Sequence, residues 1–157
     1  MITIEKAIEI AVLAHEYQKD KCGNAYIAHP LRTAVKFTDE KHFITALLHD
    51  VLEDGNEGVQ NKLRYSLKDD SDILEALELL KHEKNSPYLG YVVNLSKNEL
   101  ARDVKMADLT DNMDKIRCTN ALSLMKTNEE KERFIRKQCT YAEAYALLEQ
   151  IKNSEIK

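Results

Sequence analysis

The stretch Phe43–Asp54 reads FITALLHDVLED and predicts the helix around which the rest of the chain packs. Its first letters are mostly apolar, and no glycine or proline interrupts it, so the pattern predicts one continuous helix. On such a helix His49 neighbours Glu53, because residues four apart share a face. By the same spacing Asp50 neighbours Asp54. The four polar groups would then lie together, with leucine and valine side chains covering the other faces.

Two readings of this polar group are open. Three carboxylates and an imidazole beside a core helix repel one another and are costly to desolvate, and a bound cation would hold them together. The alternative is that Glu53 and Asp54 form a solvated helix end. His49 and Asp50 would then be an incidental hydrogen-bonded pair.

The composition is that of a globular protein. The chain has 157 residues, of which 43% are hydrophobic and 32% charged, which predicts a single domain over 1–157 with a frayed tail at 152–157. Its net charge of −4 argues against a surface built for nucleic acid or for an anionic membrane. The sequence carries no prediction of oligomeric state.

The cysteines and the N-terminus indicate the compartment. Cys22, Cys118 and Cys139 are far apart and odd in number, which favours free thiols in a reducing cytosol. The N-terminus reads as an amphipathic helix and not as a signal peptide, and no apolar run reaches membrane length. We therefore expect a cytoplasmic protein.

Helices are expected throughout. Glycine and proline number only four and two, and no window alternates apolar and polar residues between turns, so we predict an all-α fold. Capping residues and apolar spacing predict helices over about 4–18, 40–54, 59–67, 88–95, 99–116 and 129–151. Two further helices are expected to begin near residues 29 and 72.

Two further segments combine histidine or carboxylate with apolar helical patterns. Tyr26–Pro30 reads YIAHP and places His29 at a helix start, where it is either a cap or surface residue or a ligand. Residues 104–117 read VKMADLTDNMDKIR, with Asp108 and Asn112 on one line. Taken alone this segment reads as a solvated charged face, which is also the expectation for Asp111.

Taken together, the segments predict a catalytic metal centre. His29, His49, Asp50 and Asp108 form a mixed nitrogen and oxygen set that suits Mn²⁺, Fe²⁺ or Zn²⁺. The set contains no cysteine, which argues against a structural zinc site. A catalytic metal activates water and polarises a phosphoryl oxygen. The acidic residues Glu53 and Asp54 are placed to orient or deprotonate that water.

Four polar residues are candidates for binding a phosphorylated substrate. Lys19, Lys21 and Lys105 could meet phosphate charge, and Asn112 could hydrogen-bond a base or a sugar. The alternative for each lysine is an ordinary surface cation.

The order His29…His49-Asp50…Asp108 resembles that of the HD-domain metal-dependent phosphohydrolases. More narrowly, the chain is similar to the hydrolase domain of RelA/SpoT-type alarmone enzymes, in particular to small single-domain members. The matching segments are AHEYQKDKCGNAYIAHPLRTA at 14–34, ITALLHDVLED at 44–54 and VKMADLTDNMDKIR at 104–117. No synthetase segment follows, so we expect that the chain does not make the alarmone.

The resemblance implies a helical bundle around one metal ion, usually Mn²⁺. The metal ligands carry over to the four residues named above, and the catalytic acidic pair to Glu53 and Asp54. Nucleotide contacts carry over to Lys21 and Asn112. The implied reaction removes pyrophosphate from the 3′ position of guanosine tetra- or pentaphosphate.

Two departures from the family pattern concern base recognition. Asp20 stands where bifunctional members have a basic residue expected to stack on guanine, and Leu109, Thr110 and Asp111 stand where they have arginine and histidine. One alternative is therefore another nucleotide substrate: the 2′-phosphate of NADPH, an adenine alarmone or a deoxynucleotide. A second alternative is a nucleotide-sensing protein without catalysis.

Overall fold

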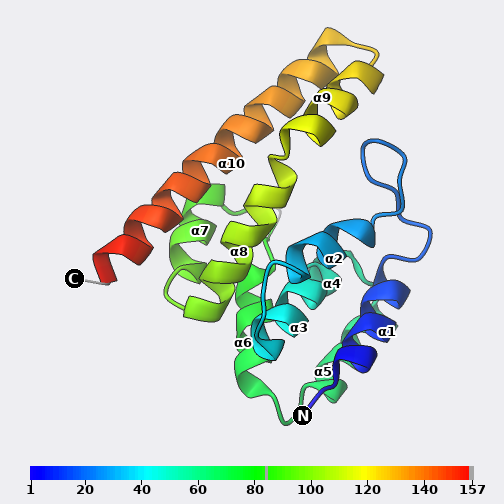
Figure 1. Cartoon of the computed structure of the whole chain (residues 1–157), viewed down its shortest axis with the longest axis vertical. Coiled ribbons are helices and arrows are strands. Elements are labelled where there is room, and N and C mark those ends of the chain that lie inside the picture. The colour runs from blue at the N-terminus through cyan, green and yellow to red at the C-terminus, as the bar shows by residue number, and fades with distance from the viewer. Residues whose placement is uncertain (84, 156–157) are drawn as a thin grey trace.

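A computed structural model describes residues 1–83 and 85–155, over which the chain is a bundle of α-helices (Figure 1). Within these ranges the only β-type pairing is one antiparallel bridge between Lys19 and Ala25. The all-α prediction is confirmed. In chain order the helices are α1 Ile4–Ala14, α2 Ala28–Ala34, α3 Glu40–Leu48, α4 Val51–Asp54, α5 Glu57–Ser66, α6 Ser71–Leu80, α7 Tyr88–Leu95, α8 Glu99–Asn112, α9 Lys115–Leu124 and α10 Asn128–Glu155.

Helix α3 lies at the centre of the bundle and contacts α1, α2, α6 and α8. Its side chains Ile44, Leu47 and Leu48 are at most 2% exposed. Burying an aliphatic side chain of this size stabilises a fold by roughly 1.5–3 kcal/mol. Asp39 caps the helix by accepting a hydrogen bond from the backbone N–H of His42 at 3.0 Å. The apolar half of the opening stretch therefore forms the core helix that its pattern predicts.

The prediction of one helix through Asp54 is wrong, because the helix breaks at His49 and Asp50. Asp50 has φ −95° and ψ −6°, in a sparsely occupied region of backbone space. Its carboxylate accepts a hydrogen bond from the Tyr26 hydroxyl, and His49 Nδ1 donates to the carbonyl of Ala46. In a continuous α-helix the Ala46 carbonyl would accept from the Asp50 N–H, so the imidazole of His49 competes with the regular hydrogen bond at this point. Only the single turn of α4 follows the break.

The helix expected over 99–116 is two helices. α8 ends at Asn112, and Asp114 starts α9 by accepting a hydrogen bond from the backbone N–H of Arg117 at 2.9 Å. Aspartate is among the best residues at a helix start. The apolar spacing continues across the junction, so the sequence pattern hides the change of direction, and α9 corresponds to no predicted helix.

The last helix, α10, packs along α8 and α7 and continues to Glu155 (Figure 1). The helix thus runs past Lys152, where the predicted frayed tail begins, and fraying of that tail stays a prediction. Arg102 pairs with Glu155 at 2.5 Å, and Lys152 pairs with Asp103 at 2.9 Å, so two ion pairs tie the end of α10 to α8. The remaining predicted tail, 156–157, lies outside the described residues.

Smaller differences concern other helix ends. α1 stops at Ala14 instead of continuing to about Gln18, and Tyr17 has a positive φ of 63°, which does not occur in a right-handed helix. α10 begins at Asn128, one residue before the predicted start at about 129, and the Thr127 hydroxyl accepts from the Glu130 N–H. Within the described residues, no helix combines the length and the apolar character that a membrane crossing requires.

Candidate metal centre

His49, at the end of α3, presents one ring nitrogen toward a group of carboxylates. Its Nδ1 donates to the Ala46 carbonyl at 2.7 Å, which leaves Nε2 to face Asp50 at 3.2 Å and Asp108 at 3.6 Å. The side chain is buried, and Nε2 has no hydrogen-bond partner among the residues that the structure describes. A buried polar nitrogen without a partner is costly, and an Nε2 lone pair beside carboxylate oxygens suits a divalent cation. The residues present therefore fit a metal ion.

His29 and Asp50 complete the tightest part of this group. One ligand atom from each of His29, His49 and Asp50 lies within 4.8 Å of the others. His29 comes from the first turn of α2, and its ring centroid is 5.1 Å from that of His49. The Tyr26 hydroxyl donates to Asp50 Oδ2 at 2.6 Å and orients that carboxylate. Segments that are twenty residues apart in sequence thus present nitrogen and oxygen atoms to one point.

Asp108 reaches the same place from α8. Its Oδ1 lies 3.1 Å from His29 Nε2 and 3.6 Å from His49 Nε2. Lys105 donates to Oδ2 at 2.8 Å, and the Asn112 amide donates to Oδ1. The structure therefore brings all four predicted ligands together, with Lys105 and Asn112 fixing one of them. Their role as ligands stays a prediction.

The electrostatics of the group favour positive charge. Burial alone would lower the pKa of His49, but the nearby carboxylates of Asp50 and Asp108 outweigh burial and raise that pKa well above its usual value. Burial also opposes ionisation of Asp108, yet Lys105 and the two histidines hold the pKa of that carboxyl well below its usual value. A divalent cation supplies positive charge in place of the imidazole protons, so protons and metal compete for the same atoms.

The group opens into a cavity of about 680 Å³, a size typical of small-molecule sites. The predicted catalytic residues Glu53 and Asp54 line this cavity as exposed carboxylates on α4. Glu53 accepts a long hydrogen bond from the backbone N–H of His82 at 3.4 Å, and Asp54 accepts from the Gln18 amide at 2.9 Å. Both lie at the cavity but outside the three-residue cluster.

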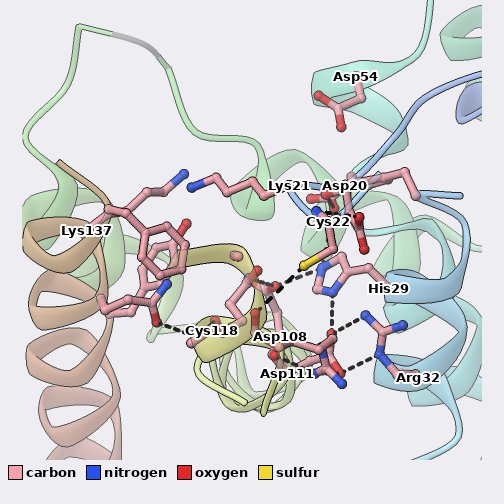
Figure 2. Close-up of a pocket in the computed structure, with 18 of the residues that line it drawn as sticks. Asp20, Lys21, Cys22, His29, Arg32, Asp54, Asp108, Asp111, Cys118 and Lys137 are labelled. Carbon is pink, nitrogen blue, oxygen red and sulfur yellow. Dashed lines mark hydrogen bonds and ion pairs between the residues drawn. The ribbon is translucent and has the colours of Figure 1, made fainter. Parts of the chain in front are cut away.

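The other part of the cavity is basic and aromatic. Figure 2 shows the side chains of Lys21 and Lys137 extending toward one another from opposite sides. Lys21 lies over the Phe134 ring at 4.5 Å, and Lys137 lies over the Tyr141 ring at 5.3 Å. Burial and then the charge of Lys137 lower the pKa of Lys21. Two facing ammonium groups repel each other, so this part of the cavity suits an anion.

The loop that carries Lys21 is organised by Asp20. One oxygen of Asp20 accepts the backbone N–H groups of Cys22 and Asn24, both at 2.8 Å. The predicted substrate residue Lys19 also lines the cavity from this loop. The carboxylate of Asp20 is therefore engaged by the backbone of its own loop.

Sequence reasoning missed several cavity residues. Asp111 was expected on a solvated face, but it is 6% exposed and accepts a hydrogen bond from His29 at 2.8 Å. Arg32 and Arg117 also bond to Asp111. The apolar spacing around Asp111 gave no signal of burial, because the groups that pair with it come from other helices. The sequence around Lys137 likewise gave no sign of a binding role, since this lysine lies on a helix with many other charged residues.

No family model matches the chain. A guanosine-3′,5′-bis(diphosphate) 3′-pyrophosphohydrolase of Aquifex aeolicus is 47% identical over 55 residues, which cover 32% of this chain and 8% of that protein. A probable guanosine-3′,5′-bis(diphosphate) 3′-pyrophosphohydrolase of Mycoplasma genitalium is 27% identical over 150 residues, which cover 86% of this chain and 20% of that protein. A GTP pyrophosphokinase of Streptomyces coelicolor is 28% identical over 120 residues, which cover 70% of this chain and 14% of that protein.

The chain thus spans between 8% and 20% of the length of these curated relatives. The similarity is partial or of low identity. Two of these relatives are named as pyrophosphohydrolases, and this supports a hydrolase related to the alarmone enzymes.

Proposed function

We propose that the chain is a metal-dependent phosphohydrolase that removes the 3′-pyrophosphate of guanosine 3′,5′-bis(diphosphate). The observation that carries the proposal is the convergence of His29, His49 and Asp50, with the buried Nε2 of His49 lacking a partner among the described residues. Asp108 adds a fourth oxygen donor beside both imidazoles. The substrate is suggested by the names of the relatives from Aquifex aeolicus and Mycoplasma genitalium.

The expected cofactor is one divalent ion, Mn²⁺ in the first place, with Zn²⁺ or Fe²⁺ as alternatives. A nitrogen and oxygen donor set suits these ions. When bound, such an ion makes water a better nucleophile at neutral pH and polarises a phosphoryl oxygen. His29, His49, Asp50 and Asp108 are the residues that would hold it.

The residues around the cavity divide the remaining work. Glu53 and Asp54 are exposed carboxylates at the cavity wall, and between them they orient the attacking water and accept its proton. Water adds to the phosphorus on the ribose 3′ oxygen, the 3′ O–P bond breaks, the ribose oxygen takes a proton, and pyrophosphate leaves. Lys21 and Lys137 offset the phosphate charge of the substrate.

The direct test is a panel of metals and substrates on the purified chain. Protein freed of metal with a chelator is supplied with Mn²⁺, Zn²⁺, Fe²⁺ or Mg²⁺, and release of pyrophosphate or phosphate is measured. We expect pyrophosphate release from guanosine 3′,5′-bis(diphosphate) with Mn²⁺. Absence of any turnover, together with tight binding of the intact nucleotide, would favour the nucleotide-sensing alternative.

The same panel tests the second candidate, a different nucleotide substrate. It includes an adenine alarmone, NADPH and deoxyguanosine triphosphate. Asp20 motivated this alternative, yet its carboxylate is engaged by the Cys22 and Asn24 amides, which weakens a direct role for it in reading the base. Preference for adenine over guanine would overturn the guanine assignment while leaving the phosphohydrolase proposal intact.

A further inference from the structure

Asp111 stands apart from the other carboxylates of the cavity because, among the described residues, its carboxylate bonds only to arginines and an imidazole. It lies on α8, three residues after Asp108, and is 6% exposed. We propose that Asp111 is a positioning residue, which holds His29 with the lone pair of Nε2 directed into the metal centre. This inference rests on the proposed metal-dependent function and adds a residue to it.

The Asp111 carboxylate is held by hydrogen bonds with His29, Arg32 and Arg117, and Figure 2 shows those with His29 and Arg32. Oδ2 lies 2.8 Å from His29 Nδ1 and 3.0 Å from a terminal nitrogen of Arg32. Oδ1 accepts from Arg32 Nε at 2.9 Å and from Arg117 at 2.7 Å. Arg32 therefore bonds both oxygens in the two-pronged arrangement that fixes a carboxylate in position and orientation. The carboxylate has little freedom to turn away from His29.

The bond to Nδ1 decides which ring nitrogen of His29 is free. A neutral imidazole has one N–H donor and one lone pair. A lone pair on Nδ1 would face the Asp111 carboxylate at 2.8 Å, and two arginines hold that carboxylate in place, so Nδ1 keeps its proton. Nε2 instead faces two of the proposed ligands, Asp108 Oδ1 at 3.1 Å and Asp50 Oδ2 at 3.7 Å, and is the nitrogen that would give its lone pair to a bound metal. A carboxylate that fixes a metal-binding histidine in this way also makes the ring a stronger donor to the metal.

The two arginines belong to different helices. Arg32 lies on α2, one turn after His29, so the imidazole and one of the arginines that fix its carboxylate partner come from the same helix. Arg117 lies on α9 and also donates to the backbone carbonyl of Asp111 at 2.7 Å. The contact between Arg117 and Asp111 therefore depends on how α9 turns away from α8. Asp114 sets that turn, because it caps the start of α9.

The competing explanation is that Asp111 is only an ion-pair link between helices. Asp114 offers a matched comparison, because it lies on the same segment and its carboxylate also approaches Arg117, at 3.6 Å. Its hydrogen bond is to the backbone of α9, and asparagine serves equally well as a helix cap. Asp111→Asn and Asp114→Asn thus remove the same charge from neighbouring places, but only the first changes the partner of His29.

The experiment measures metal binding without substrate. Titration calorimetry of the full chain with Mn²⁺ and with Zn²⁺ gives Kd for the unaltered protein and both variants, below the melting temperature of each. We expect Asp111→Asn to weaken metal binding by about 10- to 100-fold, as is usual for partners of metal-binding histidines, and Asp114→Asn to change it by less than about twofold. Equal affinities for the unaltered protein and Asp111→Asn would overturn the inference.

A second measurement does not depend on the variant folding. Nitrogen NMR of the unaltered, Zn²⁺-bound protein should show His29 protonated on Nδ1 and coordinated through Nε2, and the reverse arrangement would overturn the inference. If the unaltered chain binds no divalent ion, the proposed function falls as well. If it binds metal and hydrolyses nucleotide while Asp111→Asn binds metal equally well, only the role of Asp111 falls.

Discussion

The two ends of the cavity are built in different ways. One end, which we call the metal end, holds the proposed metal ligands and comes from α2, α3 and α8, which pack against one another; its residues His29, His49 and Asp108 are 3–6% exposed. The basic end comes from the loop that carries Lys21 and from the exposed side chain of Lys137 on α10. Side chains held by core packing have one geometry, whereas long exposed lysines can adapt. We therefore expect changes at the first end to alter metal binding and kcat, and changes at the second to alter mainly KM.

The largest expected effect is at the metal end. His49→Ala removes a proposed ligand with its buried Nε2, and we expect loss of tight Mn²⁺ binding. Metal chemistry supplies several kcal/mol to such reactions, so kcat/KM should fall by on the order of 10³-fold. His42→Ala is the control, because His42 lies on the same helix with its ring bonded to Asp39 and outside the cavity. Full activity of His49→Ala with undiminished Mn²⁺ affinity would contradict the metal centre.

A smaller effect is expected at the junction of the two ends, where Glu53 lines the cavity without joining the cluster. Glu53→Gln removes a proton acceptor and should lower kcat by about 10²-fold, within the usual range for acid–base catalysis. The affinity for Mn²⁺, measured by calorimetry, should stay the same. Glu57→Gln, at the start of α5 and away from the cavity, is the control. A lost metal affinity in Glu53→Gln would instead make Glu53 a ligand.

At the basic end, Lys137→Met should raise KM for a nucleotide bearing several phosphates by about tenfold, or about 1.4 kcal/mol. Metal affinity should not change, since Lys137 extends toward Lys21 and not toward the histidines. The effect should shrink as salt is added, because exposed charges are screened. Lys131→Met, earlier on α10 and outside the cavity lining, serves as the control. An unchanged KM at low salt would remove Lys137 from the substrate site.

The smallest effect concerns the helix that carries Lys137. Thr127 caps α10 by accepting from the Glu130 N–H at 3.1 Å, while the Glu130 carboxylate accepts from the Thr127 N–H at 3.0 Å. Thr127→Ala should lower the free energy of unfolding by about 1 kcal/mol, measured in urea. Thr119→Ala, which loses a hydroxyl that bonds the Lys115 carbonyl of its own helix, should change stability much less. Equal losses in both variants would mean that the cap does not hold the helix end.

The metal end could be predicted from sequence more fully than the basic end. His29, His49, Asp50 and Asp108 stand in short segments whose residue types and order are distinctive, and the structure brings them together. Lys21 was found in the same way, but Lys137 was not, because a lysine on a polar helix resembles any surface lysine. Asp111 was misjudged for a related reason: its burial depends on Arg32 and Arg117, which reach it from other helices.

The sequence by itself determined the helical class, most helix starts and which residues are candidates for the proposed metal centre, because apolar spacing, caps and short polar motifs act over a few neighbouring positions. Tertiary structure decided where the chain breaks within those helices. The break at Asp50 places its carboxylate against Tyr26, and the break after Asn112 brings Arg117 back onto Asp111. Such contacts join residues that are distant in sequence or lie across a change of helix direction, and their energies depend on distances that only the packed chain sets.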